Sequence, residues 1–225
     1  MAAMLGLLGW GMAVTLHGYR YSVYMRIARL ALAEKGVAYE RAEVNPFTEL
    51  PAGYLDLHPF GRVPTLVHDG FVLYETAAIT RYVDRAFGGP VLQPTAPREL
   101  ARQDQIIAVV DAYGYWPMVR QVFAQRVFRQ HVGTPVDEAE IARGLAAAPK
   151  VLAALEALAA GGRFLVGRTL SLADLHLAAM VAYFAAAPEG SAQLANHPKL
   201  SRWWLAMQET PSLAATAPGL PEKMP

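Results

Sequence analysis

Residues 60–76 read Phe-Gly-Arg-Val-Pro-Thr-Leu-Val-His-Asp-Gly-Phe-Val-Leu-Tyr-Glu-Thr. The apolar, largely β-branched residues 63–67 predict a strand, and residues 71–74 predict its returning partner. Asp69-Gly70 between them is typical of a two-residue hairpin turn, because both residues tolerate a positive φ angle. Pro64 has no backbone N–H, so we expect it at a sheet edge or at another special backbone site.

A helix is predicted directly after this hairpin, over residues 76–87. Glu75-Thr76 leads into it, and the free N–H groups of its first turn favour a bound anion. The unpaired backbone groups beside the hairpin could in turn bind an extended peptide. The stretch therefore predicts a site that holds a peptide-like ligand by its backbone and its carboxylate.

The spacing of Val63-Pro64 and Glu75-Thr76 resembles the glutathione-binding half of cytosolic glutathione S-transferases. The preceding residues 57–61, Leu-His-Pro-Phe-Gly, are similar to the Asn-Pro-x-Gly lead-in of that family. The order of predicted elements supports the resemblance over nearly the whole chain. It implies an α/β thioredoxin-like domain followed by an all-α domain, in a serine-type, phi- or theta-like bacterial member.

The composition sets outer limits on function. With 225 residues, 54% hydrophobic and 17% charged, the chain has room for one large or two small domains. A net charge of +1 gives no general attraction to nucleic acid or to a membrane. Cysteine is absent, which excludes disulfides, thiolate metal sites and cysteine nucleophiles, and is compatible with the reducing cytoplasm.

We expect four regions along the chain. Residues 1–12 are apolar, lack a basic segment and are too short to span a bilayer, which favours a disordered leader or an over-extended start over a signal peptide. Residues 13–88 form the thioredoxin-like domain. Residues 89–97, rich in proline and glycine, form a linker, and residues 98–225 form the helical domain.

The N-terminal elements are predicted from alternation and capping signals. Residues 13–17 predict a first strand, and Ser22 caps a helix over residues 23–35. Residues 37–44 predict a second strand, and residues 49–57 contain a short helical turn or two. With the hairpin and the helix after it, the order is βαβ followed by αββα.

The C-terminal half predicts helices and no strand. One long helix covers residues 98–128, with a bend near Gly114 and Pro117. A second covers residues 137–160, with Asp137-x-x-Glu140 as its cap and Pro149 as a kink.

A capping box is predicted at Ser171-x-x-Asp174, opening a helix that runs to about residue 187. Leu170 and Leu175 lie where a hydrophobic staple would close its entry. The similar motif in the transferases implies a folding role and no catalytic role. Residues 197–207 resemble the last short helix of that family.

Glutathione transfer needs a stabilised thiolate, because the thiolate is the nucleophile. Residues 22–26, Ser-Val-Tyr-Met-Arg, resemble the Ser-Pro-Tyr-Val-Arg element of serine-type transferases. The resemblance implies that Ser22 donates its hydroxyl to the sulfur at the start of a helix. Two alternatives stay open: Ser22 only caps the helix, or Tyr19 at the end of the first strand is the donor.

The resemblance also assigns the ligand's other contacts. Thr76 holds the α-carboxylate of the γ-glutamyl end, Glu75 pairs with its ammonium, and Val63 exchanges backbone hydrogen bonds with the cysteinyl unit. The bond before Pro64 is expected to be cis. Residues 48–51 lack the basic residue that serine-type members often carry there. Arg62 is therefore the candidate that binds the glycyl carboxylate. The alternative is that the Arg62 side chain is only solvated.

The acceptor pocket is expected where the first-helix loop faces the long helix. The candidates on the long helix are Tyr113, Tyr115, Trp116, Met118 and Phe123. Of these we single out Tyr113 and Trp116, together with Tyr19 and Tyr24 from the loop, although an aromatic stripe of this kind is typical of a core as well. His176 lies on an apolar helix face, as a packed core histidine does. No set of His, Asp or Glu residues has metal-ligand spacing, and no metal is expected.

The sequence thus predicts a glutathione S-transferase that conjugates a small hydrophobic electrophile in detoxification, with glutathione as co-substrate. The resemblance implies a homodimer. A glutathione-dependent peroxidase or disulfide reductase that uses the ligand's own thiol is one alternative. A non-catalytic binding or interaction module is another, supported by the missing cation in residues 48–51.

Overall fold

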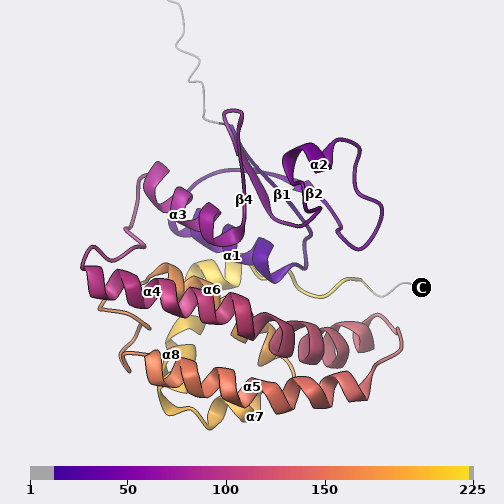
Figure 1. Cartoon of the computed structure of the whole chain (residues 1–225), viewed down its shortest axis with the longest axis vertical. Helices are drawn as coiled ribbons and strands as arrows, with labels where there is room; N and C mark the ends of the chain where they lie inside the picture. The colour runs from indigo at the N-terminus through magenta and orange to yellow at the C-terminus, as the bar shows by residue number, and fades with distance from the viewer. Residues whose placement is uncertain (1–12, 223–225) are drawn as a thin grey trace, which may run out of the picture.

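The computed structural model of the protein describes residues 13–222. The prediction for residues 1–12 lies outside the described residues. A four-stranded sheet with three helices occupies the N-terminal part, and the rest of the described chain is helical (Figure 1). The expected order of strands and helices up to residue 86 is confirmed, as is the absence of strands among described residues from 98 onward.

The sheet has the strand order β2-β1-β3-β4. Its members are β1 (Val14–Gly18), β2 (Glu40–Glu43), β3 (Thr65–His68) and β4 (Phe71–Tyr74). β1 pairs with β2 in parallel and with β3 antiparallel, and β3 pairs antiparallel with β4. The second strand is shorter than the predicted residues 37–44, and its only half-buried position is Ala42.

The hairpin between β3 and β4 forms as predicted. Asp69 and Gly70 both have positive φ angles, 49° and 81°, which is the backbone that an Asp-Gly turn provides. Pro64 directly precedes β3, an inner strand, and follows a cis peptide bond after Val63. Of the two expected placements for Pro64, the special backbone site is correct and the sheet edge is wrong.

Two helices cover the face of the sheet that is turned toward the helical part. These are α1 (Val23–Glu34) and α3 (Thr76–Ala86), which lie between the sheet and the remaining helices in Figure 1. Both are amphipathic, and fully buried side chains such as Leu30 and Ile79 join the sheet residue Leu16 in the core. The short α2 (Tyr54–Leu57) is the expected irregular turn after β2.

A single long helical segment runs from α4 (Pro97–Val109) directly into η1 (Val110–Arg129). η1 has the wider π-helical form, which begins at Val110 and includes Gly114 and Pro117, the two residues at which a bend was predicted. Close packing against α5 (Glu138–Leu158) depends on Gly144, where a Cβ atom would lie 2.8 Å from the Pro117 carbonyl oxygen.

The remaining helices are α6 (Leu172–Phe184), α7 (Pro188–Ala195), α8 (Pro198–Gln208) and α9 (Pro211–Ala215). α6 ends three residues before the predicted limit, and α7 was not predicted. The helix at residues 197–207 is confirmed as α8, but it is not the last, because α9 follows. Asp137 caps α5 as expected, accepting hydrogen bonds from the N–H groups of Ala139 and Glu140.

Asp174 is the centre of a fully buried hydrogen-bond network at the start of α6. With Ser171 it forms the predicted capping box, and its carboxylate also accepts from the backbone N–H of Leu165 at 2.8 Å and from Trp203 Nε1 at 2.9 Å. Burial raises the pKa of Asp174, while these donors oppose the shift. The residue therefore ties α6 to α8 and to the segment before it.

The linker is held by a buried ion pair. Lys35 Nζ, at the end of α1, lies 3.1 Å from Asp84 in α3 and donates to the Pro90 carbonyl oxygen at 2.8 Å. Asp84 in turn accepts from the backbone N–H of Leu92 and from Gln93 Nε2. Since both charges are buried with all these partners, the linker is fixed to the ends of α1 and α3.

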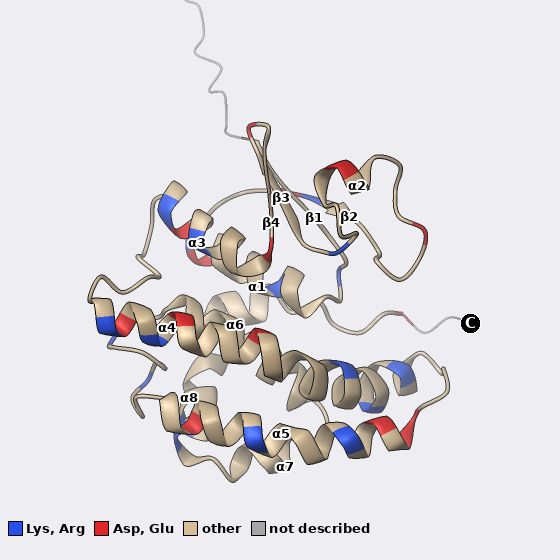
Figure 2. Cartoon of the chain, viewed as in Figure 1, with Lys and Arg blue, Asp and Glu red and all other residues tan. Residues whose placement is uncertain are grey.

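Positions of both charge signs occur along α4, η1 and α5 (Figure 2). No helix among residues 13–222 is long and apolar enough to cross a membrane.

Replacing Asp174 by Ala should lower the free energy of unfolding by roughly 3 kcal/mol or more, because at least two buried donors lose their acceptor. Asp137→Ala is the matched control: it removes an exposed helix cap and should cost about 1 kcal/mol. Urea unfolding of both variants measures the difference. Equal losses would show that the Asp174 network adds nothing beyond an ordinary cap.

Candidate functional site

The pairing of the strands brings three loops together at one end of the sheet, where β1 and β4 finish and β3 begins. His17 at the end of β1 pairs with Thr65 at the start of β3, and Thr65 pairs with Tyr74 at the end of β4. The residues that follow β1, precede β3 and follow β4 therefore meet at that end of the sheet. These are the segments that contain the predicted site residues Ser22, Arg62 to Pro64, and Glu75 with Thr76.

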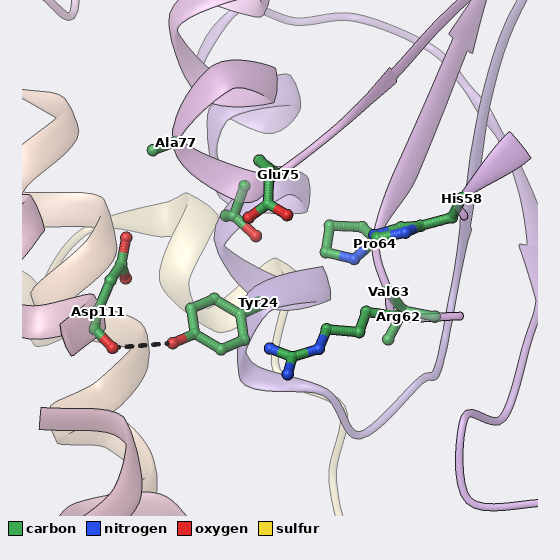
Figure 3. A pocket seen from close by; sticks show the side chains of 9 residues that line it. Tyr24, His58, Arg62, Val63, Pro64, Glu75, Ala77 and Asp111 are labelled. Atoms are coloured by element: carbon green, nitrogen blue, oxygen red, sulfur yellow. Dashed lines mark hydrogen bonds between the residues drawn. The ribbon is translucent and has the colours of Figure 1, made fainter. Parts of the chain in front are cut away.

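A cavity of about 260 Å³ opens at this end of the sheet, between the sheet and η1. Figure 3 shows its side chains, which converge from the start of α1, the segment before β3, the start of α3 and η1. The lining residues are Tyr24, His58, Arg62, Val63, Pro64, Glu75, Thr76, Ala77 and Asp111. Six of the ten predicted site residues thus line one cavity.

Glu75 and Thr76 open α3 on one wall of the cavity. Glu75 is exposed and has a φ angle of 70° and a ψ angle of 115°, a strained backbone for a residue with a side chain. Such strain costs of order 1–3 kcal/mol and is often found at functional sites. Thr76 is 7% exposed, and its position at the first turn directs helix N–H groups toward the cavity.

Arg62 provides the only cation among the lining residues. Its side chain extends across the cavity toward the ring of Tyr24 (Figure 3). Residues 48–51 supply no cation, as the sequence indicated. Arg62 therefore lies where a ligand carboxylate can reach it.

Ser22 caps α1 and is not among the lining residues. Its hydroxyl oxygen accepts from the backbone N–H of Met25 at 3.3 Å, while its own proton has no acceptor within the described chain. Gly18, just before the loop, lies against Met25 and Val63, since a Cβ atom there would approach Met25 Sδ to 2.7 Å. The loop with Ser22 is therefore packed tightly beside the cavity wall.

Tyr24 is the aromatic residue that projects into the cavity. Its hydroxyl donates to the backbone carbonyl of Asp111 at 3.5 Å, and its ring lies 5.0 Å from that of Tyr115. Burial raises the pKa of the Tyr24 hydroxyl, and the nearby Asp111 carboxylate raises it further. Tyr24 therefore stays protonated and acts as a hydrogen-bond donor.

The other predicted aromatic residues lie elsewhere. Tyr19 packs against Tyr21 and Phe47, with ring centroids 5.4 and 5.8 Å away. Tyr113 and Trp116 are 65% and 59% exposed on η1 and do not line the cavity. Tyr115, which was also a candidate on the long helix, is the residue of that group whose ring lies against Tyr24.

Three lining residues were missed by the sequence analysis: the apolar Ala77 and the polar His58 and Asp111. His58 is 2% exposed and stacks on Tyr74 at 4.7 Å, and its Nδ1 has no hydrogen-bond partner in the described chain. Burial lowers the pKa of His58. The departure from Asn in the Asn-Pro-x-Gly lead-in was the available signal for His58, whereas no local pattern marks Asp111.

Metal ligation has no support in the described chain: residues 13–222 contain no group of three or more His, Asp or Glu side chains that could hold an ion. The cavity instead combines a helix N-terminus, one guanidinium group, two carboxylates and a phenol. That set suits a small zwitterionic ligand with more than one carboxylate.

Comparison with known proteins gives matches over both parts of the chain. The family model for the glutathione S-transferase N-terminal domain matches residues 16–91, and the one for the C-terminal domain matches residues 138–203. Glutathione S-transferase F13 of Arabidopsis thaliana is 29% identical over 215 residues, covering 93% of this chain and 97% of that protein. Glutathione S-transferase F10 of the same plant is 31% identical, covering 79% and 84%.

Solved structures give the same result. The structure of glutathione S-transferase-I bound with the ligand lactoylglutathione superimposes with a TM-score of 0.77 at 28% identity. The match covers 91% of this chain and 98% of that one.

His58 should make the protein less stable at acidic pH. Because its pKa is lowered from 6.5 in the folded state, the unfolded chain takes up the proton first, and the free energy of unfolding falls as the pH drops below about 6.5. When the pH is lowered from about 7.5 to about 5.5, the free energy of unfolding should fall less for His58→Asn than for the wild type. Urea unfolding at both pH values measures the two changes. Parallel losses in the two proteins would contradict this role.

Proposed function

The chain belongs to the glutathione S-transferase family, and on this premise we propose that it binds glutathione and transfers its sulfur to a small hydrophobic electrophile. The observation that carries the proposal is the convergence of Arg62, Val63-Pro64, Glu75 and Thr76 on one cavity. Each group has the chemistry to bind one part of a γ-glutamyl tripeptide.

The γ-glutamyl end would bind at the start of α3. Its carboxylate would accept from Thr76 and the first-turn N–H groups, where the helix dipole is favourable. Its ammonium would pair with Glu75, whose strained backbone aims the carboxylate into the cavity. Arg62 would then neutralise the glycyl carboxylate from the opposite side.

Ser22 would stabilise the thiolate. Its oxygen already accepts from Met25 N–H, so the hydroxyl proton is free to be donated to sulfur while the cap is kept. A free thiol has a pKa of about 8.5, and lowering it by two units requires about 3 kcal/mol. One charge-assisted hydrogen bond contributes about 1.5–3 kcal/mol, to which the N-terminus of α1 adds.

The electrophile would lie against Tyr24 and Tyr115, the aromatic pair that joins α1 to η1. We further propose that the protein acts as a homodimer in the cytoplasm, as the family implies. The exposed Tyr113 and Trp116, three residues apart on η1, provide apolar surface for a second subunit. The absence of cysteine suits a compartment in which glutathione is reduced.

Thr76→Val should weaken glutathione binding roughly tenfold, because the isosteric change removes one hydrogen bond to a charged group. Calorimetric titration of the protein with glutathione measures this. Thr134→Val, in the loop after η1, is the matched control and should bind as the wild type does. If the wild type shows no binding up to millimolar glutathione, the proposed function is wrong.

Ser22→Ala should lower turnover with an aryl halide by about 10- to 100-fold while changing glutathione affinity little. Ser22→Thr keeps both the cap and the hydroxyl and should retain most of the activity, whereas Ser22→Gly keeps a favourable N-cap residue without any side-chain donor and should not. Steady-state kinetics of the three variants separates the two roles. Full activity in Ser22→Gly would show that Ser22 is only a cap.

A further inference from the structure

Arg120, on η1, is a half-buried cation with no hydrogen bond or ion pair to any of residues 13–222. The other arginines of η1 are paired: Arg126 forms ion pairs with two glutamates, and Arg129 donates to a backbone carbonyl at 3.0 Å. The Cζ atom of Arg120 instead lies 5.1 Å from the centroid of the Phe47 ring. The guanidinium group is thus held against an aromatic side chain, with its donors available to a ligand.

The turns of η1 place Arg120 on the face that meets the N-terminal part of the chain. Hydrogen bonds of a π-helix join residues five apart, so residue 120 lies about one turn beyond Tyr115. The Tyr115 ring lies 5.0 Å from that of Tyr24, at the start of α1. Near the end of η1, the ring of Phe128 lies 5.5 Å from that of Tyr21. Arg120 therefore lies between these two aromatic contacts along η1.

The loop with Ser22 faces the same part of η1. Ser22 lies in the sequence between the two tyrosines that make those contacts. Tyr19, in the same loop, packs on Phe47 with ring centroids 5.8 Å apart, and Phe47 in turn contacts Arg120. An electrophile that reaches a sulfur atom held by Ser22 therefore enters a space with aromatic rings around it and Arg120 on the η1 wall.

Two guanidinium groups act on the aromatic pair that was assigned to the electrophile. Burial raises the pKa of the Tyr115 hydroxyl, while the positive charges of Arg120 and Arg62 lower it. The proposed role of Arg62 is to bind the glycyl carboxylate of glutathione, so Arg120 remains for an anionic group on the second substrate. A guanidinium beside aromatic rings suits a carboxylate carried by an aromatic molecule, because its fork binds both oxygens.

We propose that Arg120 selects electrophiles that carry an anionic group, an aromatic carboxylate being the simplest case. The inference rests on the proposed function and names its substrate class. With an aryl halide, the thiol proton passes to solvent and the thiolate attacks the carbon that bears the halogen. The C–S bond forms, and the halide leaves with the electron pair of the C–halogen bond. Arg120 binds the carboxylate and orients the ring, without taking part in these bond changes.

The test uses two glutathione conjugates that differ in one group, S-(para-carboxy-ortho-nitrophenyl)glutathione and the corresponding carboxamide. Calorimetric titration gives both dissociation constants without requiring turnover, and their ratio measures the selection of the anionic group. We expect the carboxylate to bind roughly tenfold more tightly than the carboxamide in the wild type, and within about twofold of it in Arg120→Met. Arg120→Lys keeps the charge but loses the fork, so it should keep part of the preference.

Arg102→Met is the matched control. Arg102 is exposed on α4 and donates to Gln105, so its loss changes the net charge equally without altering η1. The ratio of dissociation constants should stay at the wild-type value in this variant. Glutathione alone should bind equally well to the wild type and to each variant, because Arg120 acts on the electrophile.

The outcomes separate the inference from its premise. If glutathione binds and the wild type shows no preference for the carboxylate, the inference is wrong and the proposed function stands. If Arg120→Met weakens both conjugates equally, Arg120 only packs on Phe47. A ratio that falls as much in Arg102→Met would assign the preference to overall charge and contradict the inference as well. If the wild type binds neither glutathione nor a conjugate, the proposed function and the inference both fail.

Discussion

The pairing of β1 with β3 and of β3 with β4 is the constraint on which the cavity depends. Because His17, Thr65 and Tyr74 are aligned across three strands, the loop after β1, the segment before β3 and the start of α3 must meet. A register slip of one residue would turn every side chain of a strand to the other face. Burial of Leu16 and Leu66 against α1 and α3 holds the register that brings the site residues together.

The helical part completes the site. η1 contributes Asp111 and places Tyr115 against Tyr24, so part of the proposed binding chemistry comes from residues far from the sheet. These groups are held by contacts with α6, whose start is fixed by Asp174 and whose middle carries His176. The hydrogen bonds that stabilise the helical part thus also position the wall of the cavity.

Local patterns predicted the parts of the structure that local chemistry determines. The hairpin at Asp69-Gly70, the cap at Ser22 and the box at Ser171 and Asp174 each follow from the φ angles or orphan N–H groups of neighbouring residues. Val63-Pro64 and Glu75-Thr76 indicated the cavity in two ways: by the hairpin and helix start that they flank, and by the resemblance of their spacing to that of the transferases.

The missed features depend on contacts between distant segments. Asp111 lines the cavity because η1 meets the start of α1 at Tyr24, which contacts the Asp111 carbonyl and the Tyr115 ring. Periodicity indicated apolar faces on η1 but not which aromatic residue contacts α1, so Tyr113 and Trp116 were singled out from a group that included Tyr115, the residue that contacts Tyr24. Pattern alone likewise did not predict the change to π-helical form at Val110.

The pKa of the glutathione thiol in the complex tests the central claim most directly. The ultraviolet absorbance of the thiolate can be titrated with pH in the presence of saturating protein. The account predicts a bound thiol pKa about two units below that of free glutathione. In Ser22→Ala, the bound thiol pKa should return most of the way to the value of free glutathione. A bound thiol that titrates like the free one would contradict it, because the site would then bind the ligand without activating it.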